Sequence, residues 1–230
     1  MTAAEQVGAG IVENRTYTFI LPPGWFRVDL RKALAPQVRE LTDLVLAQRS
    51  ASGDSSKLRV ALVSEMTRVT DAARSSRVLD LVLPVTLIEG TALPVSWAFM
   101  PLTVPDGADP IEMLAGIASR NDSALLTEVR ELVALRIQSR KPKSTVLMDE
   151  VLEAMSSDLG EVVLSPDGGG PQQLWVERVQ YFIGDPSRPS SWIVAAASIT
   201  DTGADDQEVL TPVLVELFDE VVKTVRMPHA

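Results

Sequence analysis

The sequence contains no cysteine and a single histidine, His229, in 230 residues. Without cysteine the chain has neither a disulfide nor a thiolate nucleophile. One histidine cannot assemble a His-based zinc site, and its place beside the last residue removes it from any Ser-His-Asp or Cys-His relay that we could build. The lack of cysteine also agrees with a reducing compartment, so we expect a cytoplasmic protein.

Long apolar runs are missing as well. A membrane helix needs about 20 consecutive apolar residues, and the longest run, 81–88, is short and contains Pro84. Residues 1–10 have neither the basic nor the apolar region of a signal peptide. We therefore expect no membrane insertion.

Basic residues are in the minority, 21 against 31 acidic ones, which gives a net charge of −10. This balance repels phosphate groups, so we expect no nucleic acid partner. The one local concentration of cations consists of Arg130, Arg136, Arg140, Lys141 and Lys143. If 133–140 is a strand, alternation places Arg136, Gln138 and Arg140 on one face. We interpret this face as solvated, with a site for an anion or an acidic partner as the alternative.

The apolar share of 46% and charged share of 23% are typical of a globular chain, and we predict one domain over 1–230, with 1–14 as a flexible tail. Periodicity predicts helices at 34–48, 57–74, 110–119, 144–159 and 211–226. It predicts strands at 17–21, 25–28, 79–87, 93–102, 174–183 and 191–200, and one or two strands in 127–140. Hairpins rather than regular βαβ units favour an α+β fold with a largely antiparallel sheet packed with helices.

Two elements carry further expectations. Pro22, Pro23 and Gly24 predict a corner between two extended pieces, after which Trp25 enters the core. The last helix carries a continuous apolar stripe that includes Phe218, so we expect it to dock on the sheet.

The hairpin predicted at 79–102 is too apolar for both of its faces to be exposed to solvent. Its second strand carries Trp97 and Phe99 on one face and Ala98, Met100 and Leu102 on the other. Exposed apolar residues on a sheet are typical of a partner-binding surface. Trp97, Phe99 and Met100 are therefore the candidate partner-binding residues, and the alternative is that helices cover both faces.

The remaining motifs predict no catalytic residue, metal site or cofactor. The glycines at 168–170 lead into Pro171 rather than the Gly-Lys-Ser or Gly-Lys-Thr of a phosphate-binding loop. Carboxylates could hydrolyse glycosides or bind magnesium or calcium, and two groups of them stand out: Asp149, Glu150 and Glu153, and then Asp205, Asp206 and Glu208. Neither group has EF-hand spacing, and acidic residues ahead of a helix complement its dipole. We predict that both groups are solvated.

The corner at 17–25, with its Pro-Pro-Gly-Trp sequence, and the helix at 217–226, Leu-Phe-Asp-Glu-Val-Val-Lys-Thr-Val-Arg, resemble an uncharacterised actinobacterial family that is similar in outline to the PsbP-like superfamily. The resemblance implies an antiparallel sheet packed between helices, an α/β sandwich, without a shared active site. Members of that superfamily mostly bind or assemble: photosystem subunits, a nuclear-import regulator and chaperone-like adaptors of bacterial secretion effectors. The two helices at 34–74 depart from the shorter connection that the resemblance implies, and no functional residue carries over.

These observations favour a non-enzymatic protein-binding module, of adaptor or chaperone-like type, that could serve bacterial secretion. One alternative is an enzyme or small-ligand-binding protein built on carboxylates. Another is a structural subunit of a homo-oligomer. We expect a protein partner, and the sequence leaves the oligomeric state open.

Overall fold

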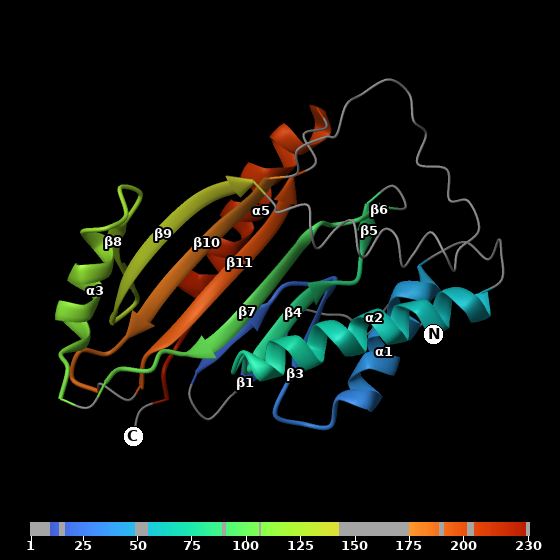
Figure 1. The fold of residues 1–230 in the computed structure, drawn as a ribbon, viewed down its shortest axis with the longest axis horizontal. Coiled ribbons are helices and arrows are strands. Elements are labelled where there is room, and N and C mark those ends of the chain that lie inside the picture. Colours follow the sequence, from blue (N-terminus) through green and yellow to red (C-terminus); the bar gives the residue numbers. More distant parts are fainter. Residues whose placement is uncertain are drawn as a thin grey trace.

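A seven-stranded antiparallel sheet forms the centre of the computed structural model, which describes residues 10–13, 17–48, 55–88, 91–105, 107–142, 175–188, 191–201 and 205–228. In spatial order its strands are β3 (Trp25–Asp29), β4 (Asp80–Pro84), β7 (Val95–Pro101), β11 (Ile193–Asp201), β10 (Trp175–Gly184), β9 (Leu132–Pro142) and β8 (Leu125–Val129). Each neighbouring pair is antiparallel. The predicted α+β class with an antiparallel sheet is confirmed (Figure 1).

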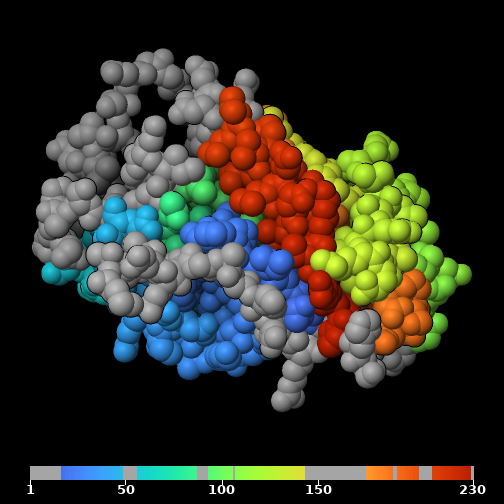
Figure 2. All heavy atoms as spheres, turned by 180° about the vertical axis from the view of Figure 1, so that it is seen from behind, coloured from blue at the N-terminus to red at the C-terminus, as the bar shows by residue number. Residues whose placement is uncertain are grey.

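Helices cover both faces of the sheet. On one face, α1 (Leu34–Ala47) and α2 (Ser55–Ser75) pack over β3 and β4, and α3 (Pro110–Ala118) packs over β9. The other face is covered by α5 (Asp205–Lys223). Figure 2 shows α5 in red, crossing this second face between the blue N-terminal part and the yellow-green part that contains β8 and β9. Among the described residues, no helix combines the length and apolarity needed to cross a membrane.

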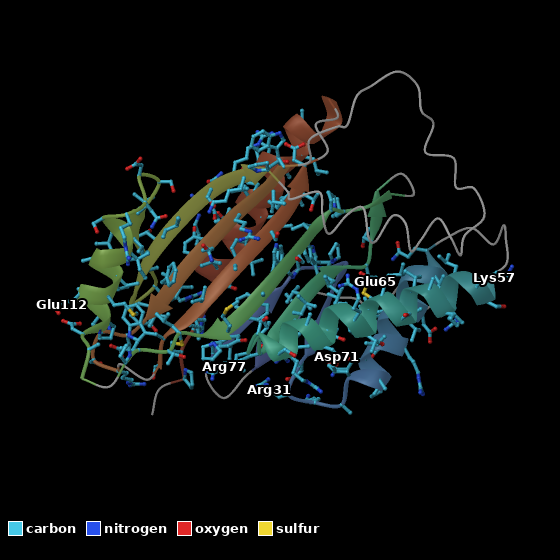
Figure 3. The ribbon with its side chains drawn as sticks, viewed as in Figure 1. Arg31, Lys57, Glu65, Asp71, Arg77 and Glu112 are labelled. Carbon is cyan, nitrogen blue, oxygen red and sulfur yellow. The ribbon has the colours of Figure 1, made fainter. Side chains whose placement is uncertain are left out.

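The largest core lies between α5 and the sheet. Leu214, Phe218 and Val222 of the helix pack on Trp97, Val179 and Tyr181 and their neighbours on β7, β10 and β11. The opposite sides of α2 and α3 carry charges. Figure 3 shows Lys57, Glu65 and Asp71 spaced along α2, and Glu112 on the side of α3 turned away from the sheet. The helices are therefore amphipathic, as their sequence period predicts.

The start predicted for the last helix, residue 211, is wrong because α5 begins six residues earlier, at Asp205, and contains Pro212 in its interior. A proline removes one backbone hydrogen bond from a helix and does not always end it. Leu210, ahead of the proline, packs against the same core as Leu214, which stabilises the added turn.

The predicted hairpin at 79–102 is present, with an interruption near its tip. β4 pairs with β7, and two short strands, β5 (Leu87–Ile88) and β6 (Thr91–Ala92), form the tip. Between β4 and β5 the backbone N–H groups of Val85 and Thr86 donate to the carbonyl of Gly24, at 2.8 and 3.3 Å. The hydrogen bonding between the two strands of the hairpin is therefore interrupted where residues 85–86 bond to the corner at 22–24.

That corner joins β2 (Thr18–Leu21) to β3, as predicted, with Gly24 at a φ of +80°. Trp25 is buried directly after it and stacks on Trp97 with 3.7 Å between ring centroids. β1 (Gly10–Glu13) pairs with β2, so these four residues of the expected tail are a strand. The helix predicted at 144–159 lies outside the described residues.

Candidate functional site

The candidate partner-binding residues on β7 are largely enclosed. Trp97 and Phe99 are fully buried beneath α5 and β2, where Trp97 contacts Phe218 and Phe99 stacks on Phe19. The prediction that they form an exposed patch is wrong, because helix and strand segments more than a hundred residues apart in the chain meet over this face. Met100 lies on the opposite face, partly exposed, and packs against the core under α1 and α2.

The carboxylates singled out in the sequence are not brought into a described site. Asp149, Glu150 and Glu153 lie outside the described residues, as do the glycines at 168–170 and His229. Asp205, Asp206 and Glu208 begin α5, but their side chains fall outside the description. Within the part of the chain that is described, no three His, Asp or Glu side chains converge as metal ligands.

The arginine-bearing face of β9 is instead the floor of a groove. Its register confirms that Arg136, Gln138 and Arg140 share one face, opposite Tyr181, Val179 and Glu177 of β10. The prediction that this face is solvated is wrong for Arg136, because α5 lies over it and leaves its side chain only 16% exposed. It holds for the Arg140 side chain, which is 54% exposed. The other face of β9, with Leu135 and Ile137, packs against α3.

The α5 groove, as we name it, is the open space between α5 and the adjoining ends of β9, β10 and β11, about 630 Å³ in volume. Its charged lining residues are the carboxylates Glu177, Asp201, Glu216, Asp219 and Glu220 and the cations Arg140 and Lys223. Val215 and Pro212 of α5 supply an apolar part of the wall. Five carboxylates against two cations leave the lining negative, and Arg136, beside the groove, offsets one of them.

Beside the groove, three side chains hold α5 against the sheet. Arg136 donates to Asp219 through Nε at 3.2 Å and Nη2 at 3.1 Å, and the Tyr181 hydroxyl donates to the same carboxylate at 2.9 Å. Burial raises the pKa of Tyr181, and the negative charge of Asp219 raises it further. The tyrosine therefore stays a hydrogen-bond donor, and α5 is fixed against β9 and β10.

Arg140 forms its ion pair with Asp201 and not with Glu177, the carboxylate opposite it in the register. In the strand register it lies opposite Glu177, yet its Nη2 donates to Asp201 on β11 at 2.8 Å. Its guanidinium also lies over the ring of Trp175, 5.5 Å from the centroid. The Arg140 cation is thereby fixed between Trp175 and Asp201.

Glu177 is the exception among the sheet carboxylates of the groove. It is only 8% exposed, and its Oε1 accepts a hydrogen bond from the neutral Nε2 of Gln138 at 2.7 Å. Gln138 Oε1 accepts in turn from Arg136 Nη2 at 2.9 Å, which fixes the orientation of the amide. No described residue donates a hydrogen bond to Glu177 Oε2 or forms an ion pair with Glu177. This carboxylate lines the groove with one oxygen unpartnered.

The strand pattern around Glu177 is a sequence signal for this site. In the strand predicted at 174–183, alternation places Glu177 on the same face as Val179 and Tyr181, which is the apolar face. An isolated acid in such a position is costly unless it is paired. It is therefore a better candidate site residue than the acids at the start of the last helix.

A second buried charge cluster lies at the β3 side of the sheet. Asp80 accepts hydrogen bonds from Tyr17 and from Arg27 Nε, the latter at 2.8 Å. Asp29 accepts from Arg31 through Nε at 2.7 Å and Nη2 at 2.9 Å, near the C-terminal end of α2 where Figure 3 shows Arg31. Burial opposes ionisation of Asp29, but the Arg31 hydrogen bonds and the charges of Arg31 and Arg27 outweigh it and hold its pKa below 3.8. Since these acids face arginines, we assign the cluster to fold stability.

One edge of the sheet is also exposed. β8 pairs with β9 and has no second neighbour among the described strands. Leu125 is 58% exposed and Leu126 is 69% exposed. Their register partners, Arg136 and Leu135, place Leu125 on the α5 face and Leu126 on the α3 face. The end of β8 that carries the two leucines therefore presents apolar side chains on both faces of the sheet.

Comparisons with protein-family models, with curated proteins and with solved structures found no match to this chain.

Proposed function

We propose that the protein is a non-enzymatic binding module that docks a partner protein along the β8 edge. The observation that carries this proposal is the pair of adjacent exposed leucines, Leu125 and Leu126, on a strand that has no second neighbour among the described strands. Proteins commonly protect free edges with charged residues, proline or bulges. Glu128 is the one charged residue of β8, so the end of the edge that carries the two leucines is apolar and favours a partner that covers it.

Strand addition is the docking mode that suits this edge. An extended segment paired to β8 gains main-chain hydrogen bonds, and its alternate side chains lie on the two faces of the sheet. Such a segment would contact Leu125 from one face and Leu126 from the other, since the two leucines lie on opposite sides. The resemblance to the PsbP-like superfamily, whose members mostly bind or assemble and include adaptors of bacterial secretion effectors, supports the same class of function.

The test begins with a photo-crosslinking residue in place of Glu128, an exposed position on β8. Adducts formed in an extract of the native organism are identified by mass spectrometry. The partner is then purified, and its Kd is measured for the wild-type chain and for Leu125→Lys/Leu126→Lys. We expect the edge variant to bind at least about tenfold more weakly, because two lysines oppose edge pairing.

The matched control is Val60→Lys/Val213→Lys, which places two lysines at exposed valines on α2 and α5. This variant should retain the wild-type Kd. Equal losses in both variants, or wild-type affinity in the edge variant, would show that the β8 edge does not bind the partner. An adduct with a second copy of the chain would instead favour the homo-oligomer.

A further inference from the structure

We propose that the α5 groove binds an organic cation, an alkylammonium or guanidinium group, and that Glu177 is the carboxylate that receives it. The site lies on the α5 side of β9, β10 and β11, and the inference does not depend on a partner at the β8 edge. It rests on the unpartnered oxygen of Glu177, on the charge of the lining and on the apolar wall beside it.

Three of the four other groove carboxylates are paired with a cation: Asp201 with Arg140, Asp219 with Arg136 and Glu220 with Lys223. The fourth, Glu216, is exposed to solvent. Glu177 is one of the two most enclosed carboxylates of the groove, and among the described residues it receives only the neutral amide of Gln138. A buried carboxylate is costly when no opposite charge compensates for its lost hydration. A bound cation would supply an opposite charge, which no described residue gives to Glu177.

Arg140 is the cation that lies opposite Glu177 in the strand register. Its Nη2 donates to Asp201 on β11 and its guanidinium lies over the ring of Trp175, and no ion pair joins it to Glu177. Asp201 is itself buried and accepts this hydrogen bond from Arg140. Arg140 is therefore engaged with Asp201 rather than with Glu177.

The groove combines a carboxylate with an apolar wall, and this combination indicates the kind of ligand it fits. Lysine and arginine side chains, and free alkylamines, combine a cationic head with an apolar stem. The groove offers both complements, a carboxylate on its floor at Glu177 and apolar contact on its wall at Val215 and Pro212. Glu216, on the same wall, adds to the negative potential that attracts a cation.

The experiment is a ¹⁵N–¹H NMR titration of the full chain with four probes: Nα-acetyl-lysine N-methylamide, its arginine counterpart, its norleucine counterpart and n-butylammonium chloride. Norleucine retains the apolar stem and lacks the charge. We expect saturable shifts at the amides of Gln138, Glu177 and Val215 with the cationic probes and none with norleucine. Tighter binding of capped lysine than of n-butylammonium would identify a peptide source, and equal binding a free amine.

Glu177→Gln is the decisive variant, because glutamine retains an oxygen that can accept from Gln138 while the charge is removed. We expect its affinity for the lysine probe to fall at least about tenfold, as for loss of a buried charge partner. The matched control, Glu112→Gln, removes an exposed carboxylate from α3, on the other face of the sheet, and should change affinity less than about threefold. Thermal unfolding and the dispersion of the NMR spectrum establish that both variants fold.

Three results would overturn the proposal. The norleucine probe could produce the same shifts as lysine, Glu177→Gln could bind as tightly as the wild type, or magnesium chloride alone could saturate the same amides. None of these results bears on the β8 edge, which is measured with a different variant and a different ligand.

Discussion

Arg136 on β9 and Asp219 on α5, 83 residues apart in the sequence, form an ion pair at 3.1 Å under the C-terminal half of the last helix. The pair is mostly enclosed, since the side chains are 16% and 24% exposed. Tyr181 of β10 donates to the same carboxylate. One aspartate therefore joins the last helix to two neighbouring strands.

Asp219→Asn should lower the free energy of unfolding by about 1 to 3 kcal/mol, because it leaves the part-buried Arg136 without its charged partner. Urea denaturation followed by circular dichroism measures the change. The control is Glu220→Gln, which breaks the exposed pair of Glu220 and Lys223 on the same helix. It should cost less than about 0.5 kcal/mol, and equal effects of the two variants would show that the Arg136 pair contributes no more than a surface pair.

Phe218→Ala should cost about 3 to 5 kcal/mol, because the ring is fully buried and its removal leaves a cavity between α5 and the sheet. The ring contacts Trp97 and Tyr181, with centroid separations of 5.6 and 6.1 Å. Val213→Ala, at an exposed position of the same helix, should change stability by less than about 0.5 kcal/mol. Unchanged thermal unfolding of Phe218→Ala would contradict the packing of α5 on the sheet.

The raised pKa of Tyr181 predicts a loss of stability in alkali. Below its ordinary pKa of 10.0 the tyrosine is protonated in both the folded and the unfolded chain, and the full stabilisation is present. As the pH rises above that value, the unfolded chain releases the proton while the folded chain retains it. The free energy of unfolding then falls by up to about 1.4 kcal/mol per pH unit from this residue alone.

Tyr181→Phe should therefore be less stable than the wild type at neutral pH, by about 1 kcal/mol for the lost hydrogen bond, and less sensitive to alkali. Urea titrations at a series of pH values above 10.0 measure the two slopes. Tyr17, the other tyrosine of the chain, is present in both proteins and does not affect the comparison. Identical slopes would contradict the raised pKa of Tyr181.

Local periodicity predicted most of the elements because each strand and helix has its own apolar pattern. It could not predict what covers each face. Alternation placed Arg136 and Arg140 together on β9, but the helix that lies over them comes about 70 residues later. Likewise, β7 pairs with β11 near the end of the chain, and the local alternation around Trp97 does not indicate which segments cover its face. The predictions of a solvated Arg136 and an exposed Trp97 were wrong for the same reason, since both depend on long-range contacts.

Two glycines should respond to alanine in opposite directions. Gly24 has a φ of +80° in the corner before β3, and a Cβ there would overlap the Thr86 hydroxyl. A left-handed conformation costs a non-glycine residue about 1 to 2 kcal/mol, and the overlap adds to it, so Gly24→Ala should cost at least about 2 kcal/mol. Gly116 lies inside α3 with no atom within 4 Å of a Cβ. Gly116→Ala should stabilise the chain by up to about 1 kcal/mol, because alanine has the higher helix propensity. Thermal and urea unfolding of the two variants measure both signs, and a neutral Gly24→Ala would contradict the close approach of the corner to Thr86.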